Sequence, residues 1–122
     1  MKVGIDSYCY SRYFYEVYPD QEASAERRSF MDFVNRAAEP EVDGGSPESC
    51  FFDSLEPVYL TEIRDVLDAK GLERVLAWGH PGGLEAGRSE SAWREMNLLI
   101  PDAQFMGADI MLDHGVVADV PV

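Results

Sequence analysis

The stretch that decides the fold class reads Leu72-Glu73-Arg74-Val75-Leu76-Ala77-Trp78. Three apolar residues follow one another at its centre, whereas a strand with one face in water alternates apolar and polar side chains. A continuous apolar run is typical of a strand that is covered on both faces, as in a parallel sheet. The stretch therefore predicts a buried strand of an α/β protein.

Working outward, strand-like and helix-like segments alternate along the chain. Strands are also expected at 3–6, 42–46 and 108–112, and amphipathic helices at 30–39, 57–70 and from 89 or 91 onward. The strand starts are spaced as in βαβ units with right-handed crossovers. The sequence predicts parallel β/α units, about four strands and three helices, in residues 1–112. A divergent tail is expected at 113–122, and a long tyrosine-rich loop at 8–28.

Single residues mark the expected helix ends. Ser29 has the side chain of an N-cap, Pro57 suits the first helical position, and Gly71 suits the residue after a helix. Pro101 falls inside the third helical pattern, where an interior proline costs about 3 kcal/mol. We therefore expect that helix to break near Ile100, unless the sequence is under relaxed constraint there.

The composition of the chain disfavours nucleic acids and membranes as partners. The chain has 122 residues, 46% of them hydrophobic, and a formal net charge of -13. Such a surface repels phosphate backbones, which disfavours nucleic acid. No apolar run approaches the ~20 residues of a membrane helix, and the N-terminus does not resemble a signal peptide. A cytoplasmic protein with Cys9 and Cys50 as reduced thiols is expected.

Polar or aromatic residues follow each predicted strand. They are Asp6 and Tyr8, then Glu48, then Trp78 and His80, and finally His114. The carboxyl ends of parallel strands share one edge, which holds the active site in barrels and the ligand crevice in open sheets. Glu48 and His80 would follow neighbouring strands, where a carboxylate and an imidazole could transfer protons or bind metal. Taken singly each has an ordinary structural role; Asp6, for example, could simply cap a turn.

Two stretches carry a family resemblance, Met1-Lys2-Val3-Gly4-Ile5-Asp6-Ser7-Tyr8-Cys9-Tyr10 and Val75-Leu76-Ala77-Trp78-Gly79-His80-Pro81. With supporting stretches at 36–44, 71–73 and 106–109, the chain resembles the sugar-phosphate isomerase/epimerase family, which are xylose isomerase-like TIM barrels. The resemblance runs from residue 1 to about 112. It implies the N-terminal half of a (β/α)8 barrel.

The resemblance also implies an activity. Such enzymes isomerise or epimerise sugars or sugar phosphates, commonly with Mn²⁺ or Mg²⁺, which polarises an oxygen while acid/base groups move a proton. Glu48 and His80 match the family's positions after strands two and three, and are the candidate catalytic residues. The candidate substrate-binding residues are Asp6, Tyr8, Trp78 and His114. The usual metal ligands come from later strands, so the ligands here stay unknown. Two histidines are also similar to zinc ligands of related apurinic endonucleases, an activity that the acidic composition disfavours.

A complete barrel needs eight β/α units in about 250 residues, and this sequence supplies three units and a fourth strand. The first hypothesis is a truncated isomerase or epimerase that is inactive alone. The second is a non-catalytic half-barrel that acts as a homodimer or with a complementing second half, because open sheet edges favour association. The third is a small sugar- or phosphate-binding module using the glycines at 82–87.

Overall fold

The strands of the computed structural model form one parallel sheet, within described residues 1–14, 19–39, 41–79 and 89–114. In sheet order they are β1 (Gly4–Asp6), β2 (Gly44–Ser46), β3 (Glu73–Gly79) and β4 (Ile110–His114). The α-helices are α1 (Phe30–Ala37), α2 (Pro57–Ala69) and α3 (Glu90–Phe105), and two 3₁₀-helices are η1 (Ser7–Phe14) and η2 (Ser49–Phe51). The predicted parallel α/β class is confirmed. The arrangement is consistent with half of a β/α barrel, which is not closed.

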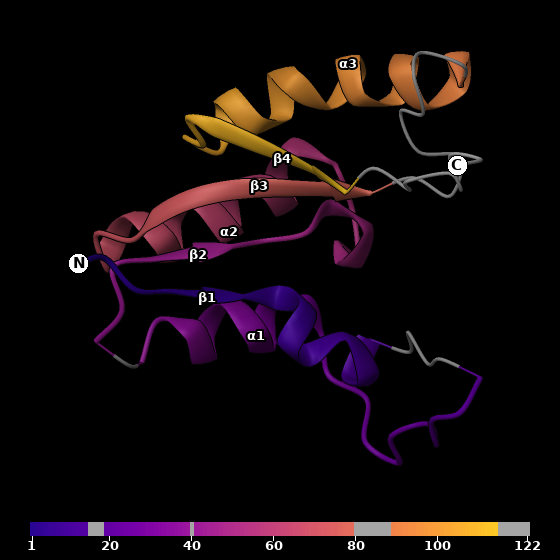
Figure 1. Ribbon diagram of the computed structural model, residues 1–122. Coiled ribbons are helices and arrows are strands. Elements are labelled where there is room, and N and C mark those ends of the chain that lie inside the picture. Colours follow the sequence, from indigo (N-terminus) through magenta and orange to yellow (C-terminus); the bar gives the residue numbers. More distant parts are fainter. Residues whose placement is uncertain (15–18, 40, 80–88, 115–122) are drawn as a thin grey trace.

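The hydrophobic core lies between the sheet and its helices. In Figure 1 all strands run from the side of the N-terminus toward the opposite edge, with α1 and α2 against the sheet and α3 beside β4. One cluster of buried side chains joins α1, α2, α3 and β3, including Phe30, Ile63, Leu76 and Ala103. The three helices thus cover the same face of the sheet. At the centre of β3, Leu76 and Ala77 are buried but Val75 is partly exposed, so the predicted cover on both faces is only partly present.

The helix ends follow the residues that mark them in the sequence. Ser29 caps α1, and Pro57 is the first residue of α2. Gly71 follows α2 with φ of 62°, a left-handed conformation that glycine adopts without steric cost. Ser89 caps α3, as one of the two alternatives predicted. These local signals hold because each supplies a hydrogen bond or dihedral angle that a helix end needs.

The α1 cap also gives a stability prediction. Ser29 Oγ accepts a hydrogen bond from Asp32 N at 3.1 Å, and Asp32 Oδ2 accepts one from Ser29 N at 2.8 Å. We expect Ser29→Ala to lower the free energy of unfolding by about 1 kcal/mol, measured by urea denaturation. Ser24→Ala, which removes one turn hydrogen bond of 3.3 Å from Glu26 N outside any helix, is the control. Equal losses in the two variants would contradict a capping role.

The same cap gives a pH dependence. The hydrogen bonds with Ser29 hold the pKa of Asp32 below its ordinary value. A carboxyl group whose pKa is lower when folded stabilises the protein above its unfolded pKa. That contribution is lost as the pH falls through the folded pKa, so the difference between Ser29→Ala and the parent should shrink in acid.

Two local predictions were wrong. The helix α3 does not break near Ile100 but continues through Pro101 to Phe105. Pro101 has no N–H to offer the carbonyl of Asn97, yet both residues are exposed, so water can satisfy that carbonyl. Buried Leu99 and Ala103 hold the helix on either side of the proline. Tertiary packing thereby outweighs the local cost.

The segment expected to be a loop from 8 to 28 instead begins inside the 3₁₀-helix η1. Tyr10 packs edge-on against Phe33 of α1, with ring centroids 5.3 Å apart. Phe14 packs against Phe30 and Phe51 at 5.8 and 5.0 Å. The aromatic residues of η1 therefore anchor it to the core. Two of the tyrosines, Tyr15 and Tyr18, lie outside the described residues.

The face of the sheet opposite the helices is open in the described part of the chain. Ile110 is 61% exposed and Leu112 is 45% exposed on β4. Strand alternation places both on the side away from buried Leu76, since Met111 pairs with Leu76 and packs against the core. The strand β4 continues to His114, two residues beyond its expected end at residue 112.

Candidate functional site

The carboxyl ends of three strands meet at one edge of the sheet. Asp6, the last residue of β1, is the partner of Ser46, the last residue of β2. Glu48 continues past β2 and forms an isolated parallel bridge with Ala77 of β3. A hydrogen bond of 2.8 Å from Ala77 N to the carbonyl of Pro47 closes the bridge. The predicted neighbourhood of the first three strand ends is therefore present.

A buried serine fixes the position of Glu48. Ser7 follows β1 directly, is fully buried, and its Oγ accepts a hydrogen bond from the backbone N–H of Glu48 at 2.9 Å. The bond joins chain positions 41 residues apart and holds the end of β2 against the end of β1. The sequence pattern did not single out Ser7 as a site residue, because nothing local distinguishes this serine from any other after a strand.

Glu48 itself is a buried acidic residue, with 6% of its surface exposed. Its backbone is extended, with φ of -100° and ψ of 122°, so the strand alternation continues from Ser46. Glu48 and Ser46, two positions apart, therefore belong to the same face of the sheet, the open one. A buried carboxylate at the carboxyl edge of a parallel β/α sheet is a candidate for function, because active sites of such proteins lie at that edge.

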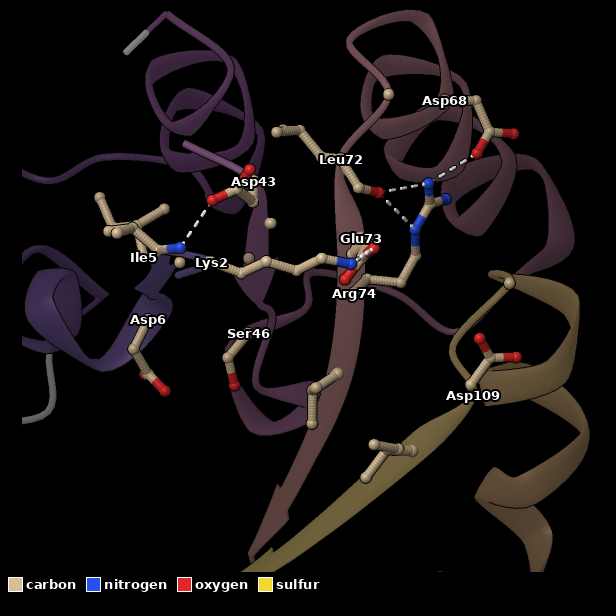
Figure 2. Close-up of a pocket in the computed structure, with 18 residues that line it drawn as sticks. Lys2, Ile5, Asp6, Asp43, Ser46, Asp68, Leu72, Glu73, Arg74 and Asp109 are labelled. Carbon is tan, nitrogen blue, oxygen red and sulfur yellow. Dashed lines mark hydrogen bonds and ion pairs between the residues drawn. The ribbon is translucent and has the colours of Figure 1, made fainter. Parts of the chain in front are cut away.

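A cavity of about 900 Å³ lies over the amino-terminal part of the same open face, lined by β1, β2, β3 and the start of β4. Figure 2 shows Asp6 and Ser46 projecting from neighbouring strands at the end nearer the carboxyl edge. Lys2 reaches across the opposite end to form an ion pair with Glu73. The hydrogen bond within this ion pair raises the pKa of Lys2 above its ordinary value. The cavity is thus polar at both ends, with Val75 between them.

The polar groups at the amino-terminal end are structural. Arg74 donates to the carbonyl of Leu72 from Nε and Nη2 and to the carbonyl of Met106 from Nη1, at 2.8 to 3.2 Å. Its Nη2 also lies 2.7 Å from Asp68 Oδ1, and the arginine side chain is only 8% exposed. Arg74 therefore connects β3 to the ends of α2 and α3. Figure 2 shows its interactions with Leu72 and Asp68.

The polar side chains at the carboxyl end of the cavity, Ser46 and Asp6, are not fully used in hydrogen bonds among the described residues. The hydroxyl oxygen of Ser46 is buried and has no hydrogen-bond partner among the described residues. Asp6 Oδ1 accepts a hydrogen bond from the backbone N–H of Tyr8 at 2.7 Å, so Asp6 caps the turn into η1 while also lining the cavity. A buried hydroxyl without a partner points to a missing polar neighbour, such as water or a ligand.

Two of the candidate substrate-binding residues lie elsewhere. Trp78 is a core residue, 2% exposed, and its indole N–H donates to Glu95 of α3 at 3.3 Å. It belongs to the helix-covered face because strand alternation places it opposite Ala77. Trp78 thus lies at the expected carboxyl edge, but its side chain points to the opposite face of the sheet from Glu48. Tyr8 is 37% exposed, packs near Phe51 with ring centroids 6.1 Å apart, and does not line the cavity.

The remaining candidates are only partly described. His114 pairs with Gly79 at the end of the sheet, so its backbone lies at the expected edge, but its side chain is outside the described residues. His80 and the glycines at 82, 83 and 87 lie outside them altogether. The pairing of Glu48 with His80 stays a prediction.

Two further features bear on cofactor and environment. Within residues 1–14, 19–39, 41–79 and 89–114, no three side chains of histidine, cysteine, aspartate or glutamate gather as a metal-binding group. None of the helices in those ranges combines the length and apolarity needed to cross a bilayer. Comparison with known proteins adds no assignment, since no family model and no curated protein matches the chain.

Proposed function

We propose that this chain is a half-barrel of the sugar or sugar-phosphate isomerase/epimerase kind, with Glu48 as its acid/base group. The observation that supports the proposal best is the buried Glu48 at the carboxyl edge, held in place by Ser7. Polar substrates bind at this edge in parallel β/α proteins. The resemblance of residues 1–10 and 75–81 to that family supports the same class of reaction.

The chemistry proposed for this edge is proton transfer on a polyhydroxylated carbon chain. Ser46 and Asp6 hydrogen-bond hydroxyl groups of the substrate from the adjacent strands. The Glu48 carboxylate removes a proton from the carbon next to the carbonyl, which gives an enediol, and returns that proton to the carbonyl carbon while the hydroxyl proton moves between the two oxygens. Epimerisation would need a proton donor on the opposite face of the enediol. The described residues offer no metal-binding group, so no step is assigned to Mn²⁺ or Mg²⁺. A cytoplasmic setting suits Cys9 and Cys50, which are exposed and form no disulfide.

Hydrogen exchange on the substrate tests this proposal without requiring complete turnover. A panel of aldoses, ketoses and their phosphates is incubated with the chain in D₂O, with and without Mn²⁺, and deuterium entering next to the carbonyl is followed by NMR. We expect exchange that Glu48→Gln slows by about 10² or more, the usual contribution of a general base. Glu62→Gln, on the exposed face of α2, should leave it unchanged. A folded chain without exchange on any substrate would exclude catalysis by the chain alone.

A second candidate function is assembly, favoured by the exposed apolar side chains of the edge strand β4. Ile110 and Leu112 lie on the open face, and burying such side chains contributes about 1.5–3 kcal/mol each. A second copy could be related to the first by a two-fold axis parallel to the strands. The β4 strand of each copy would then lie parallel to and beside the β1 strand of the other copy, which gives a sheet of eight strands. Such a homodimer, or a complementing second half, would cover the open face.

Light scattering coupled to gel filtration tests the assembly. We expect a dimer whose fraction rises with salt, because each copy carries a net charge of -13 and screening weakens the repulsion. Leu112→Glu should give a monomer, and Leu98→Glu, at a 76% exposed position of α3, should not. A monomer at every salt concentration and at high protein concentration rejects assembly with itself.

A further inference from the structure

A second cavity, of about 780 Å³, lies away from the open face, between η1, the segment before α1 and the outer side of α1. Its lining includes Arg27, Arg28 and Arg36, together with Tyr10 and Tyr13. The chain has 10 basic residues and 23 acidic ones, so a cavity with three arginines is richer in basic side chains than the chain as a whole. The proposed isomerase chemistry uses none of these residues.

Arg28 is held in place by the surrounding chain. Its backbone N–H donates to the carbonyl of Tyr13 at 3.1 Å, and its guanidinium carbon lies 5.1 Å from the centre of the Tyr13 ring. Its Nη2 is 3.1 Å from Glu26 Oε1. Its Nε is buried and has no hydrogen-bond partner among the described residues. Because the buried Nε is out of reach of a ligand, an anion would bind the exposed nitrogen atoms of this guanidinium, and its fixed position means that little side-chain entropy is lost.

The acidic residues of the cavity are already engaged by neighbouring groups. Asp32 stays ionised, because its hydrogen bonds with Ser29 and the charge of Arg28 hold its pKa low, and its Oδ2 accepts from Ser29 N in the α1 cap. Glu26 and Glu39 form the pairs with Arg28 and Arg36, and all four side chains are at least 37% exposed. Exposed ion pairs of this kind contribute little, typically 0–1 kcal/mol, so a doubly charged anion can displace them. Both guanidinium groups then become available together.

We propose that this cavity binds a small molecule carrying a phosphate group, held by Arg28 and Arg36. Guanidinium groups bind phosphate oxygens through paired, charge-assisted hydrogen bonds, which is why arginine dominates phosphate sites. The Tyr10 and Tyr13 rings, with centroids 5.7 Å apart, form an aromatic wall beside the phosphate, and their hydroxyl groups are further possible donors. The site is independent of Glu48 and of the open face.

The test uses the whole chain and compares anions at equal ionic strength, because screening alone stabilises a protein of net charge -13. The melting temperature and amide NMR shifts are measured with inorganic phosphate, with glycerol phosphate, with glycerol and with chloride. We expect saturable shifts at residues 26–36 with the two phosphates and none with glycerol or chloride. Tighter binding of glycerol phosphate would assign an organic phosphate, and equal binding would assign the phosphate group alone.

Matched variants decide whether the arginines hold the anion. Arg36→Gln should weaken phosphate binding about tenfold, the loss expected for one charge-assisted interaction. Arg94→Gln removes the same charge from another exposed helical ion pair, with Glu90, and should leave binding unchanged. Arg28→Lys keeps the charge but loses the planar fork, and should also weaken binding. Shifts that match in phosphate and chloride, or that survive in Arg36→Gln, overturn the proposal.

Discussion

Phe30→Ala should lower the free energy of unfolding by about 3–5 kcal/mol, the largest effect expected of any substitution considered for this chain. Phe30 is 1% exposed at the start of α1. Its ring centroid lies 4.7 Å from that of Phe52, 5.5 Å from that of Phe33 and 5.8 Å from that of Phe14. The Phe30 ring thus packs against η1, α1 and the segment after η2. Its removal leaves a cavity that these three elements cannot fill by moving toward one another.

Urea denaturation followed by circular dichroism measures the loss. A domain of this size has a total stability of about 5–15 kcal/mol, so the variant should be near the limit of folding at 37 °C. The control is Phe105→Ala, since Phe105 is 40% exposed and contacts the Arg64 guanidinium at 4.7 Å. We expect that control to lose about 1 kcal/mol or less. Similar losses for the two phenylalanines would mean that the aromatic cluster does not hold the fold.

Gly44→Ala should lower the free energy of unfolding by about 2 kcal/mol or more. An added Cβ at Gly44 would lie 2.5 Å from the carbonyl oxygen of Glu73 and 3.2 Å from its Cβ. The obstacle is backbone of the neighbouring strand, so it cannot rotate away as a side chain could. Relief requires separation of β2 from β3, at the place where Gly44 and Glu73 are paired.

The adjacent glycine supplies a matched control in the same strand. At Gly45 an added Cβ would meet the carbonyl oxygen of Ile5 at 3.5 Å, an ordinary contact. We expect Gly45→Ala to change stability by less than about 1 kcal/mol, and Gly44→Ala to lower the melting temperature by about 8 °C or more. A Gly44→Ala variant as stable as Gly45→Ala would show that the two strands do not approach so closely in solution.

The fold class was predictable because its signals are local. The apolar run at 75–77 requires cover on two sides, and Ser29, Pro57 and Gly71 each supply what a helix end needs wherever it packs. Pro101 is the counterexample, since burial of Leu99 and Ala103 in the assembled core kept the helix continuous. The free-energy cost of a proline in a helix does not predict a break where packing of residues distant in sequence contributes more to stability.

The candidate site was less predictable. The sequence located Asp6 and Glu48 at strand ends, and both lie at the common carboxyl edge. It could not tell which face of the sheet each side chain would take, because a shift of one residue in a strand exchanges the faces. Trp78 lies at the expected edge, but its side chain is on the helix-covered face, away from Glu48. Ser7 and the buried hydroxyl of Ser46 emerged only from contacts between segments about 40 residues apart.

The sequence by itself determined that this protein is an alternating β/α chain with a parallel sheet, since hydrophobic periodicity and helix caps are properties of neighbouring residues. Tertiary structure alone decided which groups meet. It placed Glu48 beside the end of β1, gave Gly44 its close contact with Glu73, and brought Arg28, Arg36 and Tyr13 to one cavity. The physical reason is that register and packing depend on atoms far apart in the chain, whose distances no local pattern encodes.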